Sequence, residues 1–513
     1  MKRQELKKLI EKIYPEAVPE LQISHSLKSD YGDFSTNIAM VMAKKTGKNS
    51  IQIAEIIKKE MENLFEKIEI AGPGFINFFL FKEDIQKELK NILKKDFGSF
   101  KIGNGKKVQI EFISANPTGP LTVGNARGGP LGDVLGSVFK RAGFKVEKAY
   151  YVNDCGMQIE TLGHSVLKDE QAKYKGEYID ELNKRIKEKD PYKAGKQASL
   201  IILNEMIKKT VGKMKIKYDE WFFESNLHKK KKIEKILRYL DEKGLVYEKE
   251  GAKWFKSSEY GDKRDRVVVK ANKDYTYLAG DIAYHRYKFE KKKFDKVINV
   301  WGSDHQEDIP GIKAAVQALG HKGKLEFILL QFVTLFEKGK EFKMSKRQGK
   351  YVTMAELLNS VGSDVTRFFF LQKGANTHLN FDLSLAKEQS EKNPVYYIQY
   401  AFVRINSILK KAKNQKSSIK NLDLLSHPSE LKLIKQLTVF SDIIEDTVED
   451  YQVQRIPQYA IDLSSCFHQF YQDCRVLSED KTLNQARLSL VLATKLVLKK
   501  ALDIMGISAP EKM

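Results

Sequence analysis

A strand-turn-helix pattern at residues 108–126 sets the fold class of the central part of the chain. A β-rich apolar run at 108–113 leads through a turn-forming stretch into a helical pattern near Val123. Other apolar runs alternate with helical segments farther along, and the strand candidates among them are 267–270, 297–300 and 328–330. Strands that alternate with helices fold into a parallel sheet covered by helices. We therefore expect an α/β domain over residues 106–357.

The regions on either side of this domain carry different patterns. Residues 1–97 alternate helical periodicity with short strand-like runs at 68–70 and 75–80, which predicts a small α+β domain. Residues 358–513 show helical stretches without strand signals, which predicts an all-α bundle. Within the central domain, residues 168–263 are mostly charged and helical in pattern, so a helical insertion is expected there.

Charge and cysteine content indicate the surroundings of the protein. Lys and Arg number 89 against 67 Asp and Glu, and the net charge of +22 suits a polyanionic partner, although a lysine-rich solvated surface has the same composition. The cysteines are Cys155, Cys466 and Cys474, none at metal-ligand spacing, so no metal site is predicted. No apolar run approaches membrane-spanning length and no signal-peptide core is present, so a cytoplasmic protein without membrane contact is expected.

Two separate segments carry groups suited to phosphate. Thr122 and Asn125 are short neutral donors, and Gly124 lacks a Cβ, so a phosphate or a flat base can approach the backbone at the start of a helix. Far along the chain, Lys343 and Lys346 would stabilise negative charge on a leaving pyrophosphate. Either segment alone is compatible with a common turn or a solvated loop. Their order and wide separation favour a nucleotide site.

Both segments resemble the signatures of the class I aminoacyl-tRNA synthetases, in the form used by the arginyl-tRNA synthetase family. The stretch 114–125 (SANPTGPLTVGN) is similar to the first signature and 343–354 (KMSKRQGKYVTM) to the second. Other similar segments are 31–40, 71–80, 151–160, 275–285, 301–305, 393–409 and 506–513. The resemblance implies a Rossmann-type catalytic domain, an N-terminal domain that contacts tRNA and a C-terminal bundle that reads the anticodon.

Three residues depart from that pattern or disturb it. Thr122 and Asn125 stand where the family carries histidines, and Pro130 falls inside the following helix, where it favours a kink. Threonine and asparagine donate to phosphate, but neither carries a positive charge. A Thr-x-Gly-Asn tetrapeptide resembles the form found in tryptophanyl synthetases. We therefore expect a working enzyme whose ATP affinity or rate differs from the usual form.

The resemblance also implies which residues bind the substrates. The planar cation of L-arginine is matched by fixed carboxylates, and the implied arginine-binding residues are Ser114, Asn116, Glu224, Tyr277 and Asp281. The implied ATP-binding residues are Thr122, Gly124, Asn125, Asp304, His305, Met344, Ser345 and Lys346. The catalytic residues among these motifs are Thr122, Asn125, Lys343 and Lys346. The implied partners are ATP with Mg²⁺, L-arginine and tRNA(Arg), and a monomer is expected.

Structural roles remain open for several of these residues. Tyr277 and Asp281, at i and i+4, are compatible with a helix pair that bears a surface charge. Glu224 follows three aromatic residues and is compatible with the polar edge of an aromatic cluster. His305 follows a strand, where α/β sheets place ligands, but a buried core histidine fits the pattern too.

Three functions fit the whole pattern. The first is ATP-dependent ligation of arginine to its tRNA through an arginyl-adenylate. The second is a catalytically inactive tRNA-binding relative, motivated by the missing histidines, and the third is a synthetase for another amino acid. Lys343 and Lys346 are retained together with Asp281 and Glu224, which favours the first function.

Overall fold

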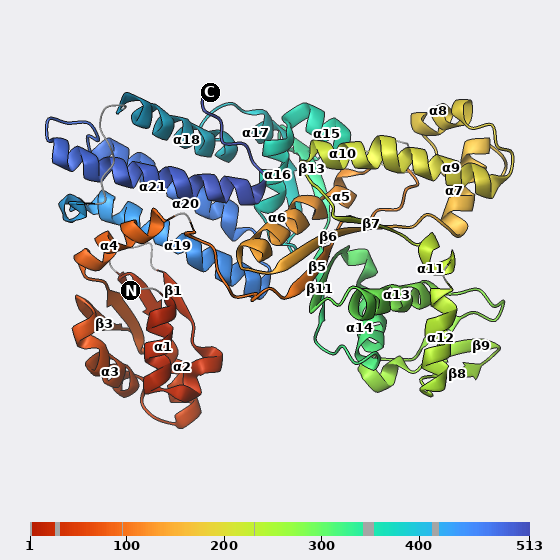
Figure 1. Ribbon diagram of the computed structural model, residues 1–513, viewed down its shortest axis with the longest axis horizontal. Coiled ribbons are helices and arrows are strands. Elements are labelled where there is room, and N and C mark those ends of the chain that lie inside the picture. The colour runs from red at the N-terminus through yellow and green to blue at the C-terminus, as the bar shows by residue number, and fades with distance from the viewer. Residues whose placement is uncertain (1–2, 26–30, 95, 230, 342–352, 413–419) are drawn as a thin grey trace.

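The computed structural model describes residues 3–25, 31–94, 96–229, 231–341, 353–412 and 420–513 (Figure 1). At its centre lies a five-stranded sheet in the order β12-β11-β5-β6-β7, in which every neighbouring pair is parallel. Its strands are β5 (Lys107–Glu111), β6 (Lys145–Val152), β7 (Glu220–Phe223), β11 (Lys296–Gly302) and β12 (Leu325–Leu330). The α/β class predicted from the alternating pattern is confirmed.

The connections of this sheet define where ligands bind. From β5 the chain continues to β6 and β7 on one side, and it later returns to β11 and β12 on the other side. The direction of winding therefore changes between β5 and β11, and ligands of α/β sheets bind at the carboxyl ends of the strands at such a point. The central strand β5 is buried on both faces, since Val108, Gln109 and Ile110 have no exposed surface.

Helices cover both faces of the sheet. The chain between β5 and β6 forms α5 (Val123–Ala126) and α6 (Gly128–Arg141), and α6 contacts β5, β6 and β11. Glycine allows this close packing, because a Cβ at Gly132 would lie only 2.2 Å from the ring of Phe112. Near β11 and β12 lie α13 (Tyr277–Arg286) and α14 (Ile309–Ala318).

The range 168–263, predicted as a helical insertion, contains strands as well as helices. Between β6 and β7 the chain forms α7 (Met157–Leu167), α8 (Glu177–Arg185), α9 (Pro191–Ile201) and α10 (Lys208–Lys213). The strand β7 then belongs to the central sheet, and it is followed by α11 (Ser225–Lys229) and α12 (Lys232–Glu242). The three aromatic residues of β7 stand in a charged region and are too few to signal a strand. This strand depends on its pairing with β6.

A small antiparallel sheet corrects one strand assignment. It has the order β10-β9-β8 and consists of β8 (Val246–Lys249), β9 (Ala252–Phe255) and β10 (Arg266–Val269). The run 267–270 was expected in the parallel sheet, but it forms β10 here. Its valines predict a strand without indicating which partner the strand will find.

The N-terminal region folds as the α+β unit that its pattern predicts. Its antiparallel sheet has the order β1-β2-β4-β3, with β1 (Ile23–His25), β2 (Phe34–Thr36), β3 (Lys67–Ala71) and β4 (Phe75–Phe79). Its helices are α1 (Arg3–Ile13), α2 (Ile38–Thr46), α3 (Ser50–Met61) and α4 (Lys82–Ile92). The helix α4 contacts α19 (Pro428–Asp450) of the C-terminal region, and Figure 1 shows this unit beneath that region at one end of the molecule.

The C-terminal region is a helical bundle with one additional strand. Its helices are α15 (Met354–Val361), α16 (Ser363–Leu371), α17 (Leu383–Lys387), α18 (Pro394–Lys411), α19 (Pro428–Asp450), α20 (Arg455–Asp473) and α21 (Lys481–Met505). No strand was expected after residue 357, yet β15 (Leu379–Asp382) pairs in parallel with β13 (Val333–Glu337), which also pairs with β14 (Lys340–Glu341). A four-residue strand with two apolar positions has almost no periodicity of its own.

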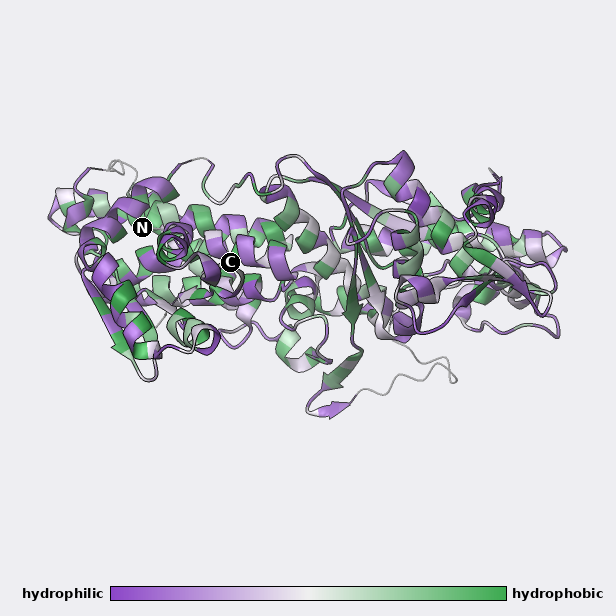
Figure 2. Ribbon diagram, turned by 90° about the horizontal axis from the view of Figure 1, so that it is seen from below, coloured by the Kyte–Doolittle hydropathy of each residue, from purple (hydrophilic) through white to green (hydrophobic). Residues whose placement is uncertain are grey.

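Hydropathy follows this architecture. Figure 2 shows hydrophobic residues along the central strands, while hydrophilic residues prevail on the outer helices and loops. Among the described helices, none combines the length and the apolar character that crossing a membrane requires.

Candidate active site

The loop that follows β5 is held in place by tyrosines from other elements. Their hydroxyls donate to three loop carbonyls: Tyr218 to Phe112 at 2.9 Å, Tyr150 to Ala115 at 2.8 Å and Tyr178 to Thr118 at 3.0 Å. Two consecutive residues of the loop, Ile113 and Ser114, have φ of +65° and +40°. Positive φ is strained for a β-branched residue, and such strain persists only where the surroundings impose it. The three tyrosines provide that constraint.

Thr122, Gly124 and Asn125 form an exposed turn at the start of α5. Thr122 is the N-cap residue: its hydroxyl accepts from the Asn125 N–H at 3.2 Å and donates to Asn125 Oδ1 at 2.6 Å. The nearest atom to a Cβ at Gly124 would be Thr122 Oγ1, 3.9 Å away, so the space above the glycine is open. The helix α5 ends at Ala126, and α6 begins at Gly128, two residues before Pro130. The dipole at this turn is therefore that of a four-residue helix, which is weaker than the sequence indicated.

A buried arginine fixes the break between the two helices. Arg127 lies between α5 and α6, is 2% exposed, and donates to four backbone carbonyls, those of Gln331, Phe332, Gly374 and Thr377. Burial lowers the pKa of Arg127 to about 10, so the guanidinium stays charged at neutral pH. This side chain ties the nucleotide turn to the β12–β13 connection and to the turn before β15. This role could not be predicted from the sequence, because the four acceptors are more than 200 residues away.

The second signature lies partly outside the described residues. Lys343, Met344, Ser345 and Lys346 are among the residues that the structure does not describe. The described chain resumes at Thr353, whose backbone forms an antiparallel bridge with Thr122, and the Met354 N–H donates to the Leu121 carbonyl at 2.8 Å. The end of the second signature therefore lies beside the turn that forms the first.

Asp304 and His305 follow the neighbouring strand β11. They lie in a 3-10 turn, Ser303–Asp308, at the edge of the sheet where the winding direction changes. The His305 side chain is 60% exposed, with Nε2 3.8 Å from Asp304 and Nδ1 3.7 Å from Asp308. A buried core histidine is thus excluded, and the ring is accessible to a ligand.

Three carboxylates gather near the same edge of the sheet. Glu111 ends β5, Glu224 directly follows β7, and Asp281 lies in α13. Burial and the charges of Glu111 and Glu224 together raise the pKa of Asp281 to about 8, although Lys288 opposes the shift. The Lys288 ammonium donates to Glu111 at 2.7 Å and is itself fully buried. A cationic ligand would therefore stabilise the ionised form of Asp281.

These surroundings bear on the two interpretations of Asp281. Burial is the largest cause of its raised pKa, which argues against a plain surface charge. Tyr277 begins α13 one turn earlier, and it is 71% exposed. The pair shares a helix as predicted, with Asp281 toward the interior and Tyr277 at the surface.

Ser114 and Asn116 are already engaged within the protein. The Ser114 hydroxyl donates to Glu111 at 3.2 Å and accepts from the Tyr151 N–H at 3.1 Å. The Asn116 amide donates to Gln158 at 2.6 Å. Both residues thus lie at the carboxyl ends of β5 and β6, where they link the loop to the elements around it.

Sequence reasoning missed a buried polar network beneath the site. It contains Glu111 and Lys288, and Lys288 also donates to Asn299 Oδ1 at 3.2 Å. The Asn299 amide contacts His285 Nε2 at 3.1 Å, and burial lowers the pKa of His285 well below its usual value, so this ring is neutral. Glu111 gave a signal, as a charge inside an apolar strand, whereas Lys288 belongs to a charged run and gave none.

Comparison with known families covers most of the chain. Residues 88–190 and 169–368 match the family described as tRNA synthetases class I (R), catalytic domain. Residues 2–80 match the arginyl tRNA synthetase N terminal domain, and residues 398–513 match the DALR anticodon binding domain. The parallel sheet and these matches define a class I aminoacyl-tRNA synthetase.

Whole-chain relatives specify the family. The arginine--tRNA ligase of Caldanaerobacter subterraneus subsp. tengcongensis is 41% identical, over 97% of this chain and 94% of the relative. That of Carboxydothermus hydrogenoformans is also 41% identical, over 98% and 96% of the two chains. The solved Thermus thermophilus arginyl-tRNA synthetase has the same fold, with a TM-score of 0.81 at 22% identity over the full length of both chains. The chain belongs to the arginyl-tRNA synthetase family, as its sequence motifs indicated.

Proposed function

We propose that the edge of the central sheet activates L-arginine with ATP and then transfers the arginyl group to tRNA(Arg), for translation. The arginine carboxylate attacks the α-phosphate, pyrophosphate leaves, and a terminal ribose hydroxyl of the tRNA attacks the resulting arginyl-adenylate. The observation that carries the proposal is the cluster of Glu111, Glu224 and Asp281 in a member of this family. Such a cluster suits a permanently charged guanidinium and no neutral or acidic side chain.

Each end of the arginine molecule meets different groups. Asp281 and Glu224 accept hydrogen bonds from the guanidinium, and charge-assisted pairs of this kind are the stronger class of hydrogen bond. Ser114 and Asn116 lie after β5 and face the α-amino and carboxylate end. Tyr277, exposed at the start of α13, covers the bound amino acid.

ATP occupies the point where the winding of the sheet changes direction. Thr122, Gly124 and Asn125 contact the nucleotide from the turn after β5, and Asp304 and His305 contact it from the turn after β11. Lys343 and Lys346, with Met344 and Ser345 between them, stabilise the β- and γ-phosphates as the pyrophosphate leaves. The bridge between Thr122 and Thr353 supports this arrangement, because it brings the end of the second signature to the first.

Mg²⁺ would accompany ATP into this site. The carboxylates of Asp304 and Asp308 are both more than half exposed beside His305, and carboxylate oxygen is the ligand type that Mg²⁺ prefers. The ion would neutralise charge on the phosphates.

The tRNA meets more than one part of the chain. We divide the chain into an N-terminal tRNA-contacting domain at 1–97, a catalytic domain at 106–357 and an anticodon-binding domain at 358–513. The N-terminal and DALR family matches and the net charge of +22 support this division. We also propose that the protein acts as a cytoplasmic monomer.

The substitution Asp281→Asn tests the arginine site. It removes the charge that faces the guanidinium and keeps the shape of the side chain. The KM for arginine should rise by about 10- to 100-fold, because a hydrogen bond to a charged group contributes about 1.5–3 kcal/mol. The KM for ATP should change little. Unchanged arginine kinetics would remove Asp281 from the site.

A further inference from the structure

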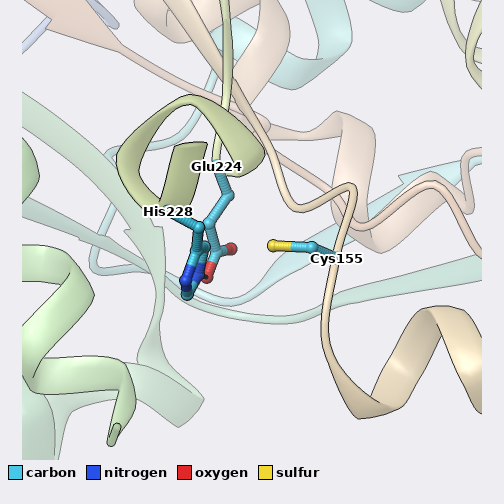
Figure 3. A group of neighbouring side chains, drawn as sticks. All are labelled: Cys155, Glu224 and His228. Atoms are coloured by element: carbon cyan, nitrogen blue, oxygen red, sulfur yellow. Dashed lines mark ion pairs between the residues drawn. The ribbon is translucent and has the colours of Figure 1, made fainter. Parts of the chain in front are cut away.

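Three side chains with metal-binding chemistry meet beside the carboxylate cluster. They are Cys155, in the loop after β6, Glu224, directly after β7, and His228, in α11. One potential ligand atom from each lies within 4.8 Å of the others. Figure 3 shows the Cys155 thiol pointing toward the Glu224 carboxylate, beside which the His228 ring lies.

We propose that Cys155, Glu224 and His228 form a binding site for a transition-metal ion of the zinc class, and that the bound ion blocks arginine. Sulfur, imidazole and carboxylate together are ligands typical of Zn²⁺, and three protein ligands leave a fourth position for water. Ca²⁺ and Mg²⁺ prefer oxygen ligands, so the thiol argues against them. The cysteine spacing predicted no metal site, because two of the three ligands come from segments about 70 residues away.

The geometry requires only small adjustments. Tetrahedral Zn²⁺ with bonds of about 2.0–2.3 Å places neighbouring ligand atoms roughly 3.3–3.8 Å apart. His228 Nε2 is 4.0 Å from Glu224 Oε1, and both belong to one helical turn. The His228 side chain is exposed, so its ring is free of the packing that would oppose such an adjustment.

Surrounding groups orient the Glu224 carboxylate. With its side-chain nitrogen turned toward Glu224, the Asn153 amide donates to Oε2 at 3.1 Å and to the Cys155 carbonyl at 2.9 Å. Oε1 then remains directed toward His228. Hydrogen bonds of this kind, made by residues behind the ligands, increase metal affinity.

The metal can reach the site and exchange for a proton. Cys155 and Glu224 are partly exposed and His228 is exposed. A cysteine thiol that binds no metal ion is protonated at neutral pH, because its ordinary pKa is about 8.5. Binding forms the metal–sulfur bond and breaks the S–H bond, and the proton passes to the buffer without any change of oxidation state.

Inhibition of arginine binding by the metal is expected because both ligands would use the Glu224 carboxylate, and this part of the inference rests on the proposed function. A metal cation bound to Glu224 neutralises the carboxylate and repels the positively charged guanidinium. Metal and arginine should therefore compete. Binding of the metal itself does not depend on this assignment.

Cobalt provides a direct probe of the metal site. We expect Co²⁺, added to the chelator-treated full-length protein, to produce a thiolate-to-cobalt charge-transfer absorption that Zn²⁺ abolishes by displacement. Cys155→Ser should lose this absorption, whereas Cys466→Ser and Cys474→Ser, which change the cysteines of the C-terminal bundle, should retain it. His228→Asn removes a direct metal ligand. Its effect on Co²⁺ affinity should therefore exceed the roughly 10–100-fold loss that follows when only a hydrogen-bond partner of a ligand is removed. No charge-transfer absorption in the unmodified protein, or the same absorption in Cys155→Ser, would overturn the metal site.

Steady-state kinetics test the block separately. Zn²⁺ should raise the KM for arginine without lowering kcat, and Cys155→Ser should abolish this inhibition while its metal-free activity stays unchanged. If cobalt binds through Cys155 but Zn²⁺ does not compete with arginine, the block is wrong, and so is the contact of Glu224 with arginine. Loss of charging activity in the metal-free protein would instead count against the proposed function alone.

Discussion

At the scale of single residues, the surroundings of Asp281 indicate most directly that a cationic ligand binds there. Its carboxyl group is held near two other acids at the edge of the sheet, and its pKa is raised to about 8. In the free protein at neutral pH, Asp281 is therefore largely protonated. A guanidinium binds the ionised form, so arginine binding should release a proton.

The first prediction concerns the pH dependence of arginine binding. A carboxyl group with a raised pKa is neutral below about pH 8, so arginine affinity should increase as the pH rises toward that value and level off above it. Below the pKa, each pH unit should change the affinity by up to about tenfold, or 1.36 kcal/mol. Calorimetry in buffers of different ionisation enthalpy measures both the affinity and the proton released.

Asp281→Asn is the control for this pH dependence, because it removes the titrating group. Its residual affinity should vary little between about pH 6 and pH 8, where both the guanidinium and the α-ammonium group of arginine are largely charged. A pH-independent affinity in the unmodified protein would contradict the assigned role of Asp281.

Thr122 allows a second prediction, because its hydroxyl caps α5 and, in the proposed function, also binds a phosphate of ATP. Thr122→Val removes the N-cap of α5 and a donor to phosphate while keeping the shape of the side chain. Stability should fall by about 1 kcal/mol. The rate of ATP–pyrophosphate exchange should fall by about 10- to 100-fold, as expected for a lost hydrogen bond to a charged group.

Thr122→Ser is the matched control, since it retains the hydroxyl. Its unfolding midpoint and its exchange rate should both stay close to those of the unmodified protein. Equal activity of the valine and serine variants would show that the hydroxyl does not contact ATP.

Part of the site could be predicted at this scale and part could not. Thr122, Gly124 and Asn125 belong to one short motif, so local sequence was sufficient to group them. The proximity of Glu111 to Asp281 depends on how β5 and α13 pack, and nothing local encodes that. The same holds for Cys155 and His228, which only the pairing of β6 with β7 brings together.

At the scale of elements, α18 and α20 present an aromatic and cationic surface. Arg404 lies 5.0 Å from the ring centroids of both Tyr400 and Tyr471, and both tyrosines are more than one-third exposed. The His468 ring stacks on Tyr400 at 5.9 Å. Aromatic rings beside a cation are suited to stacking with unpaired bases and contacting their phosphates.

The third prediction is that this surface contributes to tRNA binding. Tyr400→Ala should raise the KM for tRNA by about 5- to 100-fold, because stacking of one base contributes about 1–3 kcal/mol. Tyr400→Phe keeps the ring and should bind tRNA nearly as well as the unmodified protein. Filter binding and charging assays measure both variants, and equal binding by the alanine and phenylalanine variants would exclude base stacking at Tyr400.

The strands differ in how far local sequence predicts them. The strands β5, β11 and β12 could be predicted, because they are buried runs of apolar residues. The strand β6 begins with alternating charges and β7 has only four residues, so each depends on pairing with a neighbour. The valines of β10 indicated a strand, but its sheet is decided by the contact with β9.

At the scale of the whole molecule, Arg367 connects parts of the chain that are far apart in sequence. It is fully buried and donates to Asp133 of α6 at 2.6 Å, to the Met505 carbonyl of α21 at 2.6 Å and to the Met214 carbonyl at 2.8 Å. Gly506 lies directly against it, with a φ of +66°, and a Cβ there would lie 2.6 Å from Arg367 Cζ. The last helix is thereby linked to the helix that follows the nucleotide turn.

The fourth prediction is that breaking this link destabilises the molecule. Arg367→Met leaves the Asp133 carboxylate with only Lys148 as an ion-pair partner among the described residues. Breaking a buried pair costs about 3–5 kcal/mol. Urea denaturation should therefore show a clearly lower midpoint.

An exposed pair nearby serves as the control for Arg367. Lys215 pairs with Asp364 at 2.5 Å, and the Lys215 side chain is 43% exposed. Lys215→Met should cost no more than about 1 kcal/mol, because exposed pairs contribute little. Similar midpoints for the two variants would show that Arg367 does not hold the parts together.

The measurement that tests the whole account is transfer of labelled arginine onto total tRNA with ATP and Mg²⁺, with the other amino acids run in parallel. We expect charging with arginine alone, by a site that has Thr122 and Asn125 in its first signature. Charging with a different amino acid would contradict the role given to Asp281 and Glu224. Binding of tRNA without charging by any amino acid would contradict the catalytic competence of the site.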